Sequence, residues 1–288
     1  MPTILIPTDF SETAAAAFRF GSQLADALNY TVEVIHIHDG HTQDDRPLNK
    51  KGDLRSRAEI QGAIDQFIRF NLTPAAYQEV QETVIAEKAI KRSDIIGSPA
   101  DAIIKLSKRE DTKLIVMGGV GSGRTTSVSP IFGSIARSVA LGADCPVFLA
   151  PLGGGVPSIK EVAIAFDDVD HLRKIDTAFS EIRQVLAPKM RFVHVQSKDK
   201  TGESDAAEID LLETVVTTDF PGYPVEYDAL PSGKVSDQLL LYTDEQELDL
   251  LVLGQRKLGF FKRLFIGSEA SKVVDGASIA VLVVPIIN

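Results

Sequence analysis

A glycine-rich segment between residues 114 and 134 contains the residue types best suited to binding chemistry. Its sequence is Leu-Ile-Val-Met-Gly-Gly-Val-Gly-Ser-Gly-Arg-Thr-Thr-Ser-Val-Ser-Pro-Ile-Phe-Gly-Ser. Glycine lets the backbone approach a ligand closely, and the free N–H groups of a helix N-terminus favour an anion such as phosphate. The segment therefore predicts a buried strand, a loop and a helix start that together form a candidate nucleotide site. A plain glycine turn without a ligand is the simpler alternative.

The composition is typical of a globular chain. A length of 288 residues suggests two domains. No apolar run approaches the roughly 20 residues that span a bilayer, and the first residues lack a secretory signal pattern, so we expect a cytoplasmic protein that does not bind membranes. A net charge of -10 argues against nucleic acid as a partner. The single cysteine, Cys145, excludes an internal disulfide and is expected in the core, at the start of a buried strand.

Short apolar runs alternate with helical patterns along the first half of the chain. Strands are expected at 3–7, 31–37, about 87–93, 113–117 and 145–150. Helices are expected at 11–28, 50–70, 97–109 and 133–141, with a short one after Thr73. Strands that alternate with helices predict a parallel, doubly wound α/β sheet. Ligands of such sheets bind at the carboxyl ends of the strands, where the strand order reverses.

The same landmarks recur in the second half of the chain, which indicates an internal duplication. The glycine-rich stretch 152–158 is the expected linker between a domain at 1–151 and a domain at 159–288. The second copy has these landmarks in the same order, at 162–167, 192–195, Gly233, 250–254, 267–268 and 279–285. The second copy is shorter between its second and third strands, where we expect one helix near 204–217.

Several segments carry a resemblance to a known family. They are Ile-Leu-Ile-Pro-Thr-Asp-Phe-Ser at 4–11, Val-Ile-His-Ile at 34–37, Gly-Ser-Pro-Ala-Asp-Ala-Ile at 97–103, the glycine segment, and Ala-Asp-Cys-Pro-Val at 143–147. In this order they resemble the universal stress protein family in its tandem two-domain form. The resemblance implies an α/β fold of two similar doubly wound domains. Each would have a five-stranded parallel sheet of order 3-2-1-4-5 with helices on both faces.

The resemblance also implies a regulatory protein of the stress response that binds ATP or another adenine nucleotide, with or without Mg²⁺. In the first domain Asp9 would contact the base, Ile37 would flank it, and the phosphates would lie on the glycine loop and the helix after it. The implied residues there are Asp9, Ile37, Met117, Gly118, Gly121, Gly133, Ser134 and Ile135. The residues of a second site would be Asp167, Val195, Gly254, Lys257, Gly267 and Ser268.

Both glycine loops depart from the family pattern Gly-x2-Gly-x9-Gly-Ser/Thr. In the first copy eleven residues separate Gly121 from Gly133, so the loop is two residues longer. In the second copy Lys257 stands where the second glycine belongs, although nine residues then lead to Gly267. Binding is therefore expected first of all in the first domain.

Other functions and partners remain open at this point. A stress scaffold that binds no nucleotide, a slow ATPase or autokinase, and a pocket for a different small ligand are the alternatives. No spacing specifies a catalytic residue, and His36, which has its match in His194, favours packing over a metal site. The expected partners are the nucleotide and an unidentified protein. The resemblance implies an intramolecular pseudo-dimer through 147–150 and 281–284, with a further homodimer as an option.

Overall fold

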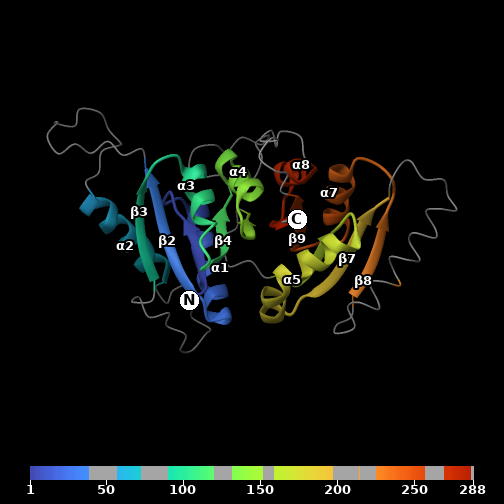
Figure 1. The fold of residues 1–288 in the computed structure, drawn as a ribbon, viewed down its shortest axis with the longest axis horizontal. Coiled ribbons are helices and arrows are strands. Elements are labelled where there is room, and N and C mark those ends of the chain that lie inside the picture. Colours follow the sequence, from blue (N-terminus) through green and yellow to red (C-terminus); the bar gives the residue numbers. More distant parts are fainter. Residues whose placement is uncertain are drawn as a thin grey trace. The chain divides into compact units, whose positions relative to one another are not determined.

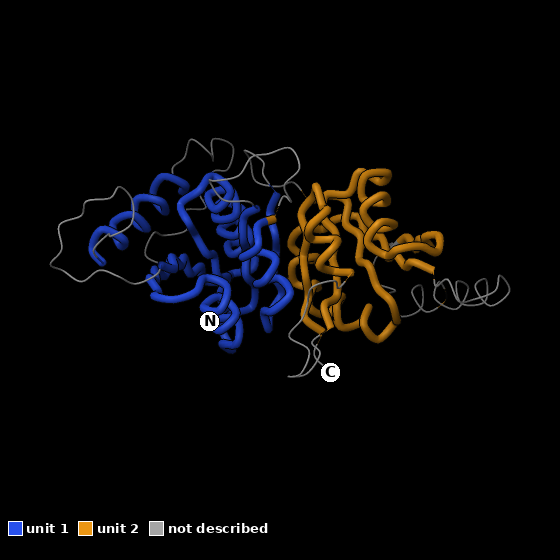
Figure 2. Tube along the Cα trace, turned by 90° about the horizontal axis from the view of Figure 1, so that it is seen from above, with its two compact units in different colours: residues 1–129, 133–156 blue, residues 130–132, 157–288 orange. Residues whose placement is uncertain are grey.

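The computed structural model describes residues 1–38, 57–72, 90–119, 132–151, 159–196, 214, 225–256 and 269–286. The chain forms two compact units, and Figure 2 draws them in two colours. The first contains residues 1–129 and 133–156, and the second contains residues 130–132 and 157–288. The predicted linker 152–158 lies outside the described residues, so the predicted domain boundaries stay a prediction.

The first unit is a doubly wound sheet with the strand order β3-β2-β1-β4-β5 (Figure 1). Every described strand pair in it is parallel. Its elements are β1 (Thr3–Pro7), α1 (Glu12–Leu28), β2 (Thr31–His38), α2 (Arg57–Leu72), β3 (Ile90–Ile96), α3 (Pro99–Leu106), β4 (Thr112–Gly118), α4 (Ser134–Gly142) and β5 (Val147–Ala150).

The second unit repeats this order as β8-β7-β6-β9-β10, again with parallel pairs. Its elements are β6 (Glu161–Ala165), α5 (Val169–Leu186), β7 (Lys189–Val195), β8 (Val225–Leu230), α7 (Val235–Glu245), β9 (Leu250–Arg256), α8 (Glu269–Gly276) and β10 (Ala280–Ile286). The predicted fold class, with two similar doubly wound sheets of order 3-2-1-4-5, is confirmed.

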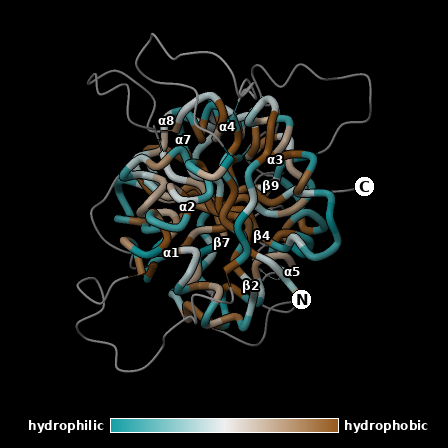
Figure 3. The backbone as a smooth tube through the Cα atoms, turned by 90° about the vertical axis from the view of Figure 1, so that its left-hand side faces the viewer, coloured by the Kyte–Doolittle hydropathy of each residue, from teal (hydrophilic) through white to brown (hydrophobic). Residues whose placement is uncertain are grey.

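Apolar strands between two helix layers form the core of each unit. In the first unit α1 packs beside α2 on one face, and α3 packs beside α4 on the other. In the second unit α5 covers one face, and α7 packs beside α8 on the other. The central strands β4 and β9 are almost wholly buried, and the hydrophobic colour of Figure 3 gathers on the strands. Strands buried on both faces explain the continuous apolar runs of the sequence.

Local capping explains where the long helices begin and end. The hydroxyl of Ser11 accepts the N–H of Ala14 at 3.2 Å and starts α1. Asn29 ends the same helix in the left-handed conformation, with φ 56°. In the second unit the Asp168 carboxylate accepts the N–H of His171 at 2.8 Å and starts α5. These side chains satisfy helix-end groups that would otherwise need water.

The predicted element boundaries need several corrections. The third strand extends to Ile96, three residues past its predicted end, because β3 stays in register with β2 as far as His38. The fifth strand begins at Val147 rather than at Cys145, because Pro146 has no N–H to donate to a ladder. The described helices α2 and α3 end at Leu72 and Leu106. The predicted helix after Thr73 and the one near 204–217, except Thr214, lie outside the described residues.

Cys145 is buried in the first unit, as expected for a core residue, with 6% of its surface exposed. Burial raises the pKa of its thiol to about 12. Because the thiolate is the reactive form, labelling with a disulfide reagent at pH 8 is expected to be about 1,000-fold slower than in urea. Stopped-flow labelling with and without urea checks this. Equal rates under both conditions would contradict the buried position.

Candidate functional site

The carboxyl ends of β1 and β4 meet where the strand order of the first unit reverses. β1 lies between β2 and β4, and the helices that follow these two central strands cover opposite faces. A doubly wound sheet opens into a crevice at this point. The turn after β1 carries Asp9, and the end of β4 carries Met117 and Gly118. Residues more than 100 positions apart in sequence are thus brought to one edge of the sheet.

A cavity of about 240 Å³ occupies this crevice, and we call it the first cavity. Its lining includes every described residue of the predicted first site: Asp9, Ile37, Met117, Gly118, Gly133, Ser134 and Ile135. The remaining described lining is Pro7, Thr8, Thr13, Ala14, Ile35, Pro99, Ile103, Gly119 and Ala136. The predicted residue Gly121 lies outside the described part of the chain. The structure therefore brings the others together, while their contact with a ligand stays a prediction.

The turn between β1 and α1 is held by its own side chains. The Asp9 carboxylate accepts the backbone N–H of Ser11 at 3.0 Å and its hydroxyl at 2.5 Å. Phe10 has φ 63°, a conformation that few bulky residues adopt. Its N–H donates to the Thr8 hydroxyl at 2.9 Å. Asp9 thus supports the start of α1 while it lines the first cavity, so a structural role and a ligand contact are compatible.

A histidine in each unit fixes the end of the first strand. Nδ1 of His36 lies 2.8 Å from the carbonyl oxygen of Thr8, and Nδ1 of His194 lies 3.1 Å from that of Phe166. A carbonyl can only accept, so both nitrogens donate. The ring of His36 also packs on Phe10, with centroids 4.5 Å apart. The predicted packing role of His36 is therefore confirmed, and it recurs in the duplicated unit.

The two described glycines of the predicted first site have different physical roles. A Cβ on Gly118 would lie 2.2 Å from the carbonyl oxygen of Thr13, so glycine is required there for β4 to approach α1. A Cβ on Gly133 would meet nothing within 4 Å. Gly133 is the N-cap of α4 and supplies no side-chain hydrogen bond to the helix end. Among the described residues, no side chain caps the first N–H groups of α4 beside the cavity.

The second unit has a cavity of about 230 Å³ at the corresponding place, which we call the second cavity. The predicted residues Asp167, Val195 and Gly254 line it. Lys257, Gly267 and Ser268 lie outside the described residues, so the predictions at these positions stay predictions. A Cβ on Gly254 would meet the side-chain tips of Ile286 and Ile175 at 2.5 and 2.8 Å. Apolar side chains therefore lie against Gly254 in the second unit, whereas the backbone of α1 lies against Gly118 in the first.

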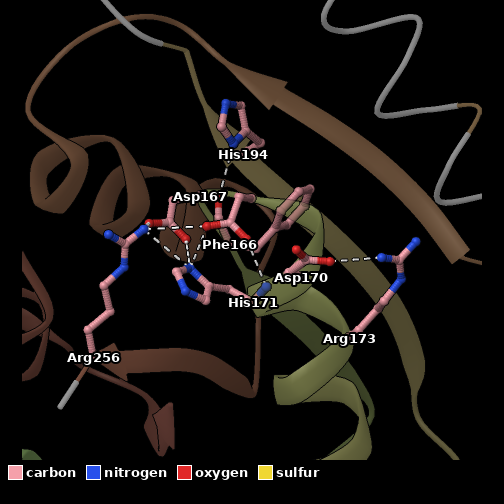
Figure 4. Close-up of polar contacts among 8 residues, drawn as sticks. Phe166, Asp167, Asp170, His171, Arg173, His194 and Arg256 are labelled. Carbon is pink, nitrogen blue, oxygen red and sulfur yellow. Dashed lines mark hydrogen bonds and ion pairs between the residues drawn. The ribbon is translucent and has the colours of Figure 1, made fainter. Parts of the chain in front are cut away.

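Arg256 joins the second cavity to an ionic cluster, which the sequence analysis did not anticipate (Figure 4). Its guanidinium donates to the Asp167 carboxylate and lies 3.4 Å from that of Asp168. Nδ1 of His171 lies 2.7 Å from oxygens of both carboxylates. Arg256 can reach them because β9 continues two residues past Gly254, paired with β10. The local signal was the pair Asp167 and Asp168 immediately before α5, with His171 in the first turn of that helix.

Asp167, Asp168 and His171 could together hold a metal ion, since one ligand atom of each lies within 4.8 Å of the others. The Arg256 guanidinium already supplies a cation to these carboxylates. Partial burial raises the pKa of Asp167, but the hydrogen bond from His171 and the charge of Arg256 outweigh it. The net pKa of this carboxyl is therefore below its ordinary 3.8. The cluster is consistent with an internal ion network.

Replacing Arg256 with glutamine is expected to raise the pKa of Asp167. A depressed carboxyl pKa stabilises the fold above the ordinary value of 3.8, and this contribution is lost as pH falls through the lower folded value. Because both side chains are more than half exposed, at 52% and 60%, the loss of unfolding free energy at pH 7 should be below about 1 kcal/mol.

Carbon-detected NMR titration of the Asp167 carboxyl measures this effect. The matched control is Arg173→Gln, which removes the guanidinium that lies 2.9 Å from Asp170 in the same helix. An unchanged Asp167 pKa in R256Q would contradict the proposed cause of the shift.

Known proteins resemble this chain in sequence and in structure. A universal stress protein of Mycobacterium tuberculosis is 21% identical over an alignment 307 positions long, which covers 97% of this chain and 96% of the relative. The crystal structure of a universal stress protein from Archaeoglobus fulgidus matches with a TM-score of 0.65 at 20% identity, covering 98% of each chain. A universal stress protein solved in complex with cAMP covers 53% of this chain and 98% of its own, with a TM-score of 0.37 and 21% identity.

Within the described ranges, no helix combines the length and apolarity that a membrane crossing requires.

The two halves of the sequence each match one family profile. The profile of the universal stress protein family matches residues 1–151 and 175–285, which is most of the chain and includes the whole first sheet. The chain therefore belongs to the universal stress protein family.

Proposed function

We propose that this protein binds an adenine nucleotide in the first cavity and acts as a regulatory member of its family in the stress response. The observation that carries the proposal is the lining of that cavity. Asp9, Ile37, Met117 and Gly133 line one space of about 240 Å³. They come from elements far apart along the chain, from the turn after β1 to the start of α4. This space adjoins the uncapped N-terminus of a helix.

The chemistry of the walls suits a base and sugar with a phosphate outside. Ile35, Ile37, Ile103 and Met117 offer apolar contact to a planar base. Asp9 offers a carboxylate acceptor to the hydroxyl and amino groups of a nucleoside. The first N–H groups of α4, with the positive end of the helix dipole, would bind the phosphate oxygens. The same proposal includes Mg²⁺ bound through those phosphates, an unidentified protein partner and a cytoplasmic location.

Binding rather than turnover is the better-supported activity. Among the described lining residues Asp9 is the one ionisable side chain, and its carboxylate accepts two hydrogen bonds from Ser11 in its own turn. No described residue there is placed to activate a water or a hydroxyl. A bound nucleotide would instead favour one conformation of the surrounding loop, which a partner protein could distinguish.

Isothermal titration of the full chain with adenosine, AMP, cAMP and ATP tests the proposal, with GTP as the control for the base. We expect one site per chain and a preference for adenine over guanine. Native mass spectrometry of the freshly purified protein should show the same ligand class retained. Absence of any adenine ligand in both measurements would overturn the proposal and favour a scaffold without nucleotide.

A further inference from the structure

The second cavity differs from the first in what its polar groups already bind. Asp167 accepts from Arg256 and His171, and Nδ1 of His194 donates to the Phe166 carbonyl. Glu269 accepts the N–H of Ser236 at 2.8 Å. The rest of the described lining is apolar: Ala165, Phe166, Ile175, Val193, Val195, Val235, Leu239, Leu253, Gly254, Ala270, Val273 and Ile286. Thus each charged lining side chain already has a partner within the protein.

Glu269 changes the electrostatics of the helix end that faces this cavity. When Gly267-Ser268 is aligned with Gly133-Ser134, Glu269 stands at the position of Ile135. Its carboxylate also takes up the N–H of Ser236 in the first turn of α7. A hydrogen bond from Lys272 lowers the pKa of Glu269, despite some burial, so the carboxylate is charged at neutral pH. A phosphate placed there would meet a negative charge.

The charges in the described part of the lining also disfavour an anionic ligand. Asp167 and Glu269 supply two carboxylates, and Arg256 supplies one guanidinium that already contacts Asp167. The Asp167 carboxylate already occupies the guanidinium of Arg256, so an anionic ligand would compete with Asp167 for this group. A neutral ligand would not compete in this way. Its apolar surface would be buried against the eleven apolar side chains and the glycine of the described wall.

We propose that the second cavity is a binding site for a small uncharged, mainly apolar molecule and that it excludes nucleotides. Its volume of about 230 Å³ is below the roughly 300–1,000 Å³ of pockets for drug-sized ligands, so the ligand is a compact molecule of a few rings or a short chain. The protein would then have two sites of different chemistry, because the first turn of α4 carries no acidic side chain, whereas that of α8 carries Glu269. This inference goes beyond the proposed nucleotide function and does not depend on it.

A pair of fluorescent probes with the same aromatic skeleton tests the inference. N-phenyl-1-naphthylamine is neutral, and 1-anilinonaphthalene-8-sulfonate adds one negative charge. With the full chain under native conditions, the neutral probe should bind with at least about tenfold lower Kd than the anionic one, a difference of about 1.4 kcal/mol. Saturating ATP should not displace the neutral probe from the second cavity.

Substitutions in α8 assign the probe to this cavity. Ala270 is half-buried in the first turn of α8 and lines the cavity, so Ala270→Phe should fill the space and weaken the neutral probe at least tenfold. The matched control is Ala100→Phe, in the first turn of α3, where the residue is equally half-buried and does not line the first cavity. Glu269→Gln removes the negative charge and should improve binding of the anionic probe alone. Circular dichroism of each variant verifies folding.

Two results would overturn the inference. One is neutral-probe binding that A270F and A100F affect equally, because the probe would then lie elsewhere. The other is an anionic probe or a nucleotide that binds as tightly as the neutral probe and is lost in A270F. Neither result would bear on nucleotide binding in the first cavity, which the titrations with adenine ligands measure separately.

Discussion

Gly133→Val is expected to weaken adenine-nucleotide binding by at least about 30-fold, or about 2 kcal/mol. Gly133 precedes the first N–H groups of α4, and a Cβ there would project into open space beside the first cavity. In the proposed complex the phosphate occupies that space, so the valine would separate phosphate oxygens from the helix end and leave both groups without their hydrogen bonds. Isothermal titration with ATP and AMP measures the loss.

The fold should tolerate this substitution. Gly133 has φ -69° and ψ 168°, which valine adopts readily, and no described neighbour would clash with its Cβ. The expected change in unfolding free energy is about 1 kcal/mol, the usual cost of a poor N-cap. Ser98→Val is the matched control, because Ser98 is the N-cap of α3, makes no side-chain cap bond and does not line the first cavity. Equal affinities in G133V and the wild type would refute the proposed phosphate position.

Gly118→Ala is expected to destabilise the first unit by about 3 kcal/mol, at the upper end of overpacking effects. The added Cβ would lie 2.2 Å from the oxygen and 2.4 Å from the carbon of the Thr13 carbonyl. These are backbone atoms in the first turn of α1, so relief requires the helix to move off the sheet. Urea unfolding followed by the reactivity of Cys145 measures the effect, because that thiol reports on the first unit.

Gly254→Ala is the matched substitution in the second unit. Its Cβ would meet the terminal methyl groups of Ile286 and Ile175, which can rotate away, so we expect a cost of about 1 kcal/mol. It should leave the urea dependence of Cys145 labelling unchanged. If both variants lose the same stability, or if G118A loses none, then close helix approach is not the reason for glycine at the end of β4.

Local patterns in the sequence were sufficient for most of the secondary structure. The cap at Ser11 and the apolar spacing behind it predicted α1, and the buried apolar run of β4 was predicted within a residue at each end. These signals depend on neighbouring residues alone. Boundaries were less accurate where pairing with another strand decides the length, as in β3, and where proline interrupts a ladder, as before β5.

Part of the candidate site could also be anticipated from the chain. The position of a ligand crevice follows from the alternation of strands and helices, and the resemblance to a family supplied Asp9, Gly133 and their neighbours. Their roles could not be separated in this way. The sequence alone predicts the same role for Gly118 and Gly133. In the structure, Gly118 is required by the close approach of α1, whereas a Cβ on Gly133 would meet no described atom within 4 Å.

The sequence by itself determined the duplication, the α/β class and the location of two crevices, because periodicity, turn residues and repeated landmarks are local properties. Only the tertiary structure decided how the two crevices differ. Arg256 and Asp167 are 89 positions apart, and they meet because β9 continues past Gly254 and ends beside the turn after β6. Such contacts depend on the register of a whole sheet, which no local pattern specifies. The glycine segment that marks the first site thus has a counterpart whose described surroundings favour a different ligand.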